Sequence, residues 1–130
     1  MNKSFRWWKE VIWAPEYYWK MDFAEHKVTC NGAGAAEGTK FPNTFYGLSL
    51  RPAFDVHDKM YKEGKTKKDK FEADATMFLN CIKIVDWKGG FLKLPRVYRA
   101  ASYYIAVHYK GDKAFWKGKV RPNRGTATSG

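Results

Sequence analysis

"RPAFDVHDKMYKEGKTKKDKFEADATMFLNCIKIVDWK", residues 51–88, holds two helical patterns separated by a very short polar turn. Proline is favoured at the first position of a helix, where its missing N–H costs nothing, and Pro52 opens the first pattern. Gly64 closes that pattern, because glycine commonly follows the last helical residue. We therefore predict a first helix over residues 52–63.

The second pattern follows almost at once. Thr66 suits an N-cap, and Asp69 then lies in the first turn, where the helix dipole favours negative charge. Gly89 ends the pattern, so we predict a second helix over residues 67–87. Two long helices joined by so short a turn must pack antiparallel. The apolar side chains predicted on the buried face of this helix are Phe71, Ala75, Phe78, Leu79, Ile82 and Val85.

One carboxylate lies inside that apolar stripe. Asp74 comes three residues after Phe71 and four before Phe78. A buried carboxylate is costly unless other groups pair with it. The facing helix offers His57 and Tyr61, which lie one turn apart on one side. We therefore predict that Asp74 binds both, and that it fixes the tautomer and orientation of the histidine.

The rest of the chain is less regular. Residues 1–29 are rich in aromatic side chains and are expected to be irregular, with a short helix before Pro15. Residues 30–38, "CNGAGAAEG", form a glycine-rich loop, and "FPNTFYGLSL" is expected to run extended into the first helix. A third helix is predicted from Pro95 to about Lys110, followed by a flexible basic tail over about 118–130. The fold class is mainly α.

Composition limits the class of protein. The 130 residues fit one domain, 1–130, and 45% hydrophobic residues are typical of a globular chain. The net charge of +11 indicates affinity for polyanions, which could be nucleic acid, an anionic phospholipid surface or an acidic partner. The sequence has no run of about 18 apolar residues, so no membrane span is predicted. We expect the many Trp and Tyr side chains to lie mostly in the core, with a membrane-binding face as the alternative.

The two cysteines allow at most one disulfide. Cys30 and Cys81 are expected to be packing residues, although one bridge between them stays open. The N-terminus lacks the apolar stretch of a secretory signal. A cytoplasmic or virion-associated protein is expected, and release from the cell is left open. His26 and His108 are expected to be satisfied structural histidines.

Asp58 is rotated about 100° from His57 on the first helix, so it faces elsewhere, toward the glycine-rich loop if that loop packs beside the helix. Backbone carbonyls of such a loop, one carboxylate and waters would make a calcium site built from hard oxygen ligands. The ion would polarise a carbonyl or phosphoryl oxygen while His57 activates a water.

These motifs together resemble the phospholipase A2 superfamily. "HDKMY" supplies the His-Asp pair and the tyrosine, "EADATMF" supplies the inward aspartate, and "CNGAG" is similar to a calcium loop. The stretch from residue 30 to 85 also resembles small phage and bacterial members. Secretory members have cysteines flanking the His-Asp pair, whereas Phe54 occupies one such position here.

The resemblance implies calcium-dependent hydrolysis of a phospholipid acyl ester. It makes His57 the general base for the attacking water, held by Asp74 and Tyr61. The backbone N–H of Gly32 would help to stabilise the oxyanion. The implied calcium ligands are the carboxylate of Asp58 and the backbone carbonyls of Cys30, Gly32 and Gly34.

Other functions stay open at this point. The alternative prediction is a non-catalytic member, a structural or effector protein of a phage or bacterium that keeps the helical pair for stability. A basic nucleic-acid binder using the positive charge and exposed aromatics ranks lower, because no known module is visible. A His-Asp phosphohydrolase fits poorly, since His26 lies in an irregular segment.

Overall fold

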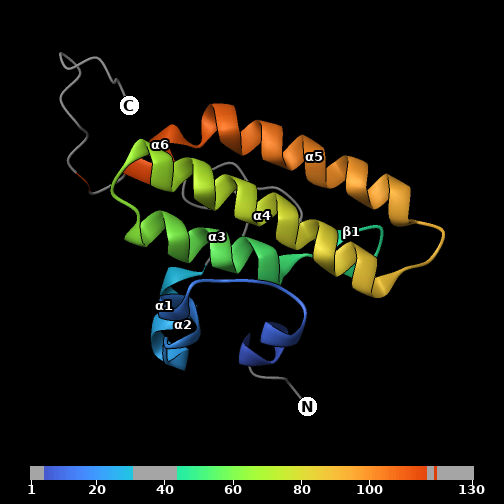
Figure 1. Cartoon of the computed structure of the whole chain (residues 1–130), viewed down its shortest axis with the longest axis horizontal. Coiled ribbons are helices and arrows are strands. Elements are labelled where there is room, and N and C mark those ends of the chain that lie inside the picture. The colour runs from blue at the N-terminus through green and yellow to red at the C-terminus, as the bar shows by residue number, and fades with distance from the viewer. Residues whose placement is uncertain (1–4, 31–43, 117–118, 120–130) are drawn as a thin grey trace.

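The computed structural model describes residues 5–30, 44–116 and 119, and within them the protein is mainly helical. Seven helices account for 75% of these residues, and a two-stranded sheet completes the described secondary structure. The three longest helices lie side by side, with α4 between α3 and α5 (Figure 1). They are α3 (Arg51–Glu63), α4 (Lys67–Lys88) and α5 (Lys93–Lys110).

The predicted pair of antiparallel helices is confirmed. Pro52 lies in the first turn of α3, and the N–H of Gly64 closes the helix by donating to the carbonyl of Met60. Thr66 and Asp69 form a reciprocal capping box at the start of α4: each side chain accepts from the other residue's backbone N–H. Both ends of the short turn are therefore fixed by local interactions, which sets α4 back against α3.

The predicted buried face of α4 is wrong in part. Phe71 and Leu79 are exposed, although both belong to the apolar stripe. The helix instead buries three polar side chains between its apolar ones, so apolar spacing alone placed the face incorrectly. The buried residues of α4 are Lys70, Ala73, Asp74, Met77, Asn80, Cys81, Ile84 and Val85.

Helix α5 begins two residues before Pro95, at Lys93. The turn before it contains Gly89 and Gly90, both with positive φ (67° and 94°), a conformation that glycine adopts without steric cost. This tight turn returns the chain along α4. Helix α5 thereby packs along α4 at an outer edge of the molecule (Figure 1), and Tyr103 of α5 stacks on Phe54 of α3 with ring centres 5.6 Å apart.

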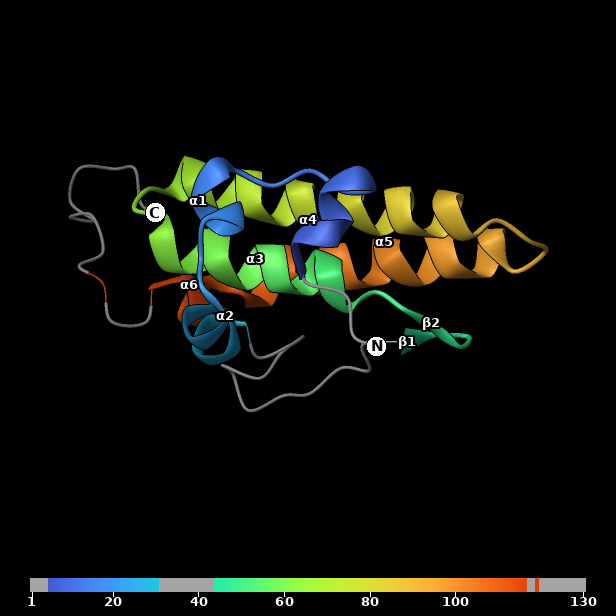
Figure 2. The same cartoon turned by 90° about the horizontal axis from the view of Figure 1, so that it is seen from below.

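The short helix expected before Pro15 is present, and most of the remaining N-terminal segment, which was expected to be irregular, is helical as well. It forms a 3-10 helix, η1 (Phe5–Glu10), and the short helices α1 (Glu16–Trp19) and α2 (Phe23–Thr29). Pro15 is the N-cap of α1. The Asp22 side chain caps α2 by accepting from the N–H of Glu25 at 2.8 Å. These elements lie at the α3 edge, opposite α5 (Figures 1 and 2).

A β-hairpin replaces the extended run expected before α3. Strands β1 (Thr44–Phe45) and β2 (Leu48–Ser49) pair antiparallel across a two-residue turn, in which Tyr46 and Gly47 have φ values of 50° and 84°. Positive φ at both positions matches the twist of a hairpin. The buried Arg96 of α5 ties the hairpin down by donating to the carbonyls of Phe45 (3.0 Å) and Tyr46 (2.5 Å).

A short helix that was not predicted, α6 (Asp112–Trp116), follows α5 and packs against α3. The predicted tail lies outside the described residues, apart from Lys119.

No helix in the described part of the chain has the length and apolar character needed to cross a membrane.

Cysteines and aromatic residues are distributed differently from expectation. Cys30 and Cys81 are both buried and both free, so the bridge left open from sequence is not formed. Burial raises the pKa of both thiols, that of Cys81 to about 12, which favours the inert thiol form. The Trp and Tyr side chains are not mostly in the core. Six are exposed, namely Trp13, Tyr17, Tyr46, Trp87, Tyr98 and Tyr109.

Candidate functional site

The carboxylate of Asp74 is fully buried between α3 and α4 and forms the centre of the candidate site. Its Oδ1 accepts a hydrogen bond from Nε2 of His57 at 2.8 Å and from the hydroxyl of Tyr61 at 2.6 Å. Both contacts were predicted from helical spacing, and both are confirmed. The α3–α4 turn makes them possible, because it brings the middle of α3 opposite the first turns of α4.

Sequence reasoning missed the third partner of Asp74, which is Lys70. Its ammonium group is 2.8 Å from Oδ2 of Asp74, and the residue is only 2% exposed. The same nitrogen lies 3.3 Å from the carbonyl oxygens of Val107 and His108 near the end of α5. A lysine is almost never buried unless it is paired. The spacing of four residues between Lys70 and Asp74 was the available signal.

These three donors decide the charge state of Asp74. Burial by itself would raise the pKa of this carboxyl, but the hydrogen bonds from His57, Lys70 and Tyr61 outweigh it and hold the pKa below its usual range. The side chain is therefore an anion at neutral pH. Lys70 supplies the compensating positive charge, so the buried network does not require a protonated histidine for neutrality.

The orientation of His57 follows from this anion. Nε2 faces the carboxylate, so in the neutral imidazole Nε2 carries the hydrogen and Nδ1 carries the lone pair. Among the described residues, no hydrogen bond engages Nδ1. A histidine held in this way can accept a proton at Nδ1.

Tyr61 is positioned by close packing around its ring and hydroxyl. Its ring lies 5.2 Å from that of Phe115 in an edge-to-face arrangement, which brings α6 against the site. Gly111, between α5 and α6, makes room for the hydroxyl, since a Cβ there would lie 2.5 Å from it. No sequence motif identified this glycine, because the contact joins segments far apart in the chain.

Asp58 faces a different direction from His57, as predicted. It is half-buried and lies close enough to Tyr18 and Cys30 to raise the pKa of both groups, although burial is the larger cause in each case. It therefore lies on the side where α2 ends and the glycine-rich loop begins. Gly32 and Gly34 lie outside the described residues. In the described part of the chain, no three His, Cys, Asp or Glu side chains gather as a metal-binding group.

Cys30 connects Asp58's side of α3 to a second polar cluster. The carbonyl oxygen of Cys30 accepts from Nη2 of Arg51 at 2.9 Å, and its thiol lies 3.3 Å from the carbonyl of Asp55. Nε of Arg51 is 2.7 Å from Oδ1 of Asp55. One predicted calcium ligand, the Cys30 carbonyl, therefore already binds a cationic side chain.

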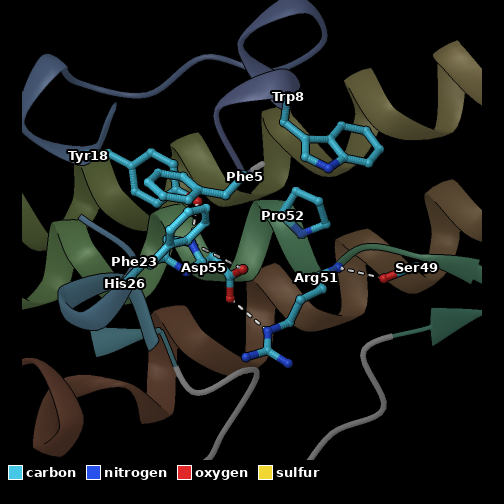
Figure 3. A pocket seen from close by; sticks show the side chains of 9 residues that line it. All are labelled: Phe5, Trp8, Tyr18, Phe23, His26, Ser49, Arg51, Pro52 and Asp55. Carbon is cyan, nitrogen blue, oxygen red and sulfur yellow. Dashed lines mark hydrogen bonds and ion pairs between the residues drawn. The ribbon is translucent and has the colours of Figure 1, made fainter. Parts of the chain in front are cut away.

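This cluster borders a pocket of about 380 Å³ between the N-terminal segment and α3 (Figure 3). Phe5 stacks on His26 there with ring centres 4.0 Å apart. Nε2 of His26 lies 3.0 Å from the hydroxyl of Tyr18, so this histidine is satisfied as expected. Nδ1 of His108, in contrast, is buried without a hydrogen-bond partner among the described residues. The pocket walls combine aromatic rings with the Arg51–Asp55 pair.

The buried carboxyl of Asp55 should give the free energy of unfolding an unusual pH dependence. Burial raises its pKa from 3.8 to about 6, and Arg51 offsets this only in part. Between pH 3.8 and about pH 6, the folded protein binds more protons than the unfolded chain. The free energy of unfolding therefore falls as the pH rises through this range. The shift corresponds to about 3 kcal/mol. We expect Asp55→Asn to remove this fall, as measured by urea unfolding at a series of pH values with EDTA present.

The control for this experiment is the difference between the two stability curves. Burial lowers the pKa of His26, which makes stability rise with pH over part of the same window. Nε2 of His26 also lies 3.8 Å from Oδ2 of Asp55, so both curves are measured in a His26→Gln background, which removes that contribution. A difference that stays constant from pH 4 to pH 7 contradicts the assignment.

No family model, curated protein or solved structure matches this chain. A functional assignment therefore depends on the geometry around His57, Asp58 and Asp74 and on the sequence motifs that contain them.

Proposed function

We propose that this protein hydrolyses an acyl ester of a phospholipid in a calcium-dependent reaction, in the manner of the phospholipase A2 superfamily. The observation that supports it most directly is the buried network of His57, Tyr61 and Asp74. It orients one histidine nitrogen toward a carboxylate and leaves the other with its lone pair. The basic charge of the chain suits a substrate presented on an anionic phospholipid surface.

In this proposal His57 is the general base. Nδ1 takes a proton from the attacking water, and the charge that forms on the imidazole is stabilised by Asp74, 2.8 Å from Nε2. Tyr61 keeps the carboxylate in place through its 2.6 Å hydrogen bond. Lys70 holds the other carboxylate oxygen, so Asp74 remains an anion throughout. The backbone N–H of Gly32 is the proposed donor to the oxyanion.

The proposed calcium ligands are Asp58 and the backbone carbonyls of Cys30, Gly32 and Gly34. Among the described residues, the half-buried carboxylate of Asp58 and the adjacent Cys30 supply oxygens of the kind that calcium prefers. When bound, the ion would act as a Lewis acid toward the ester carbonyl. A site with one carboxylate is expected to be weak, with a Kd on the order of 10⁻⁴ to 10⁻³ M.

Asp58→Asn is expected to abolish calcium binding while leaving the fold intact, because it removes the only charged ligand in the proposed set. Isothermal titration calorimetry with calcium chloride measures the loss. Glu72→Gln is the matched control, since it removes one negative charge from an exposed position on α4. Equal calcium binding by wild type and Asp58→Asn excludes Asp58 as the ligand.

The proposed reaction is tested by fatty-acid release from vesicles that mix anionic and zwitterionic phospholipids, with calcium or with EDTA. Release that requires calcium and is lost in Asp58→Asn supports the proposal. If wild type releases no fatty acid under any calcium or lipid condition, the proposed function is wrong.

A non-catalytic member of the same superfamily is the second candidate. The observation that favours it is the 2.9 Å contact between Arg51 and the Cys30 carbonyl, which places a positive charge beside a proposed calcium ligand. In this alternative the chain is a phage or bacterial structural or effector protein that keeps the helical pair for stability. Wild-type protein that neither binds calcium nor releases fatty acid, yet unfolds cooperatively, supports this candidate.

A further inference from the structure

Helix α5 carries an apolar stripe on the face turned away from the protein. Its buried residues, Arg96, Ala100 and Tyr103, lie on one side of the helix. At 100° per residue, its large exposed side chains lie on the opposite side, within roughly 60° of one another. These side chains are 55% to 77% exposed. We call them the α5 stripe, and they are Leu94, Tyr98, Ile105 and Tyr109.

The apolar surface extends beyond the N-terminal end of α5 into the turn between α4 and α5. Phe91 follows the two glycines with positive φ and is 93% exposed. Contiguous apolar side chains of this size on a soluble protein generally mark a surface that binds a partner.

The charges around the stripe select the partner. The segment from Trp87 to Gly111 contains five Lys and Arg residues and no Asp or Glu. Arg99 and Lys110 flank the stripe on one side by helical periodicity. Amphipathic helices with apolar side chains on one face and basic residues beside them lie in the interface of anionic membranes. The exposed basic residues of this segment are Lys88, Lys93, Arg99 and Lys110, and of these Lys93 is paired with Asp86 at 2.5 Å.

We propose that the α5 stripe, with Phe91, docks this protein onto a phospholipid surface that contains anionic headgroups. Lipid as the partner rests in part on the proposed function, whereas the place of docking rests on exposure and charge. Self-association through this face is opposed by the net charge of +11 on each copy. The aliphatic side chains of Leu94 and Ile105 suit acyl chains rather than stacking with nucleic-acid bases.

The experiment is co-sedimentation with sucrose-loaded vesicles, using pure phosphatidylcholine or a mixture with phosphatidylglycerol. All proteins carry His57→Gln, so that hydrolysis does not alter the vesicles and a failure of the proposed reaction does not affect the result. We expect binding to the anionic mixture and weaker binding to phosphatidylcholine. The double variant Leu94→Gln/Ile105→Gln should lower the partition coefficient by about tenfold or more.

The matched control is Phe23→Gln/Val28→Gln, which makes the same change at two exposed apolar residues of α2, at the opposite edge of the molecule. It should bind vesicles as the parent does, and both double variants should keep the circular dichroism melt of the parent. Equal binding by the stripe variant and the parent overturns the proposal. So does a parent protein that binds neither vesicle, binds oligonucleotide through the stripe instead, or forms dimers that the stripe variant dissociates.

Discussion

Asp74→Ala is expected to lower the free energy of unfolding by about 3–5 kcal/mol, the range for breaking a buried ion pair. The substitution leaves the Lys70 ammonium buried without its anion, and it also removes the acceptor of His57 and Tyr61. The unpaired charge is the larger cost. Guanidinium unfolding followed by circular dichroism measures the change.

The matched control for Asp74→Ala is Glu72→Ala, which removes a carboxylate from an exposed position of the same helix and should change stability only slightly. The double variant Lys70→Met/Asp74→Leu separates the two causes. It removes both charges and keeps the side-chain volume, so it should recover part of the loss. A single variant as stable as wild type would falsify the assignment of Asp74 to the core.

Hydrolysis is expected to fall by about 10²–10⁴-fold in His57→Gln, the range that a general base contributes. Glutamine can still donate to Asp74 through its amide, so the fold and calcium binding should be retained, but it cannot take a proton from water. Fatty-acid release from mixed vesicles with calcium measures the loss, and calorimetry checks the calcium affinity.

His108→Gln is the control for this loss, because His108 is a half-buried histidine whose side chain lies outside the Asp74 network. It should hydrolyse lipid as wild type does. Hydrolysis that persists in His57→Gln shows that another group is the base, even if the protein is an esterase. Loss of calcium binding together with activity would show that the substitution disturbs more than proton transfer.

The helical pair could be predicted because its signals are local. Pro52, Gly64 and the Thr66–Asp69 capping box each act within one turn of the chain, so their effect can be read without knowing the fold. The inward position of Asp74 was also predictable, since a carboxylate within an apolar stripe must find donors. Three of its interactions are decided by helical spacing and by the short turn.

Other features depend on contacts between distant segments. The burial of Lys70 is decided by α5, whose carbonyls at Val107 and His108 receive its remaining protons. Lysine spacing on a helix normally indicates a solvated face, so the residue was not considered for the core. Phe71 and Leu79 were assigned to the core by apolar character alone, whereas tertiary packing of α4 buries polar side chains in their place.

The short elements were missed for a different reason. Helices α1, α2 and α6 have too few residues for a hydrophobic period to be visible. The Asp22–Glu25 cap was the available signal for α2. The hairpin turn at Tyr46 and Gly47 lacks the Asn-Gly or Asp-Gly pair that usually marks such turns.

The location of Lys70 and Asp74 on one helix has a consequence for the order in which the protein folds. Their ion pair spans four residues, so it needs only a turn of α4 and no tertiary contact. The bonds from His57 and Tyr61, in contrast, form only when α3 docks. When α4 packs against α3, the charge of Asp74 is therefore already balanced by Lys70. The cost of removing Asp74 from water is thereby reduced before the interface between the two helices closes.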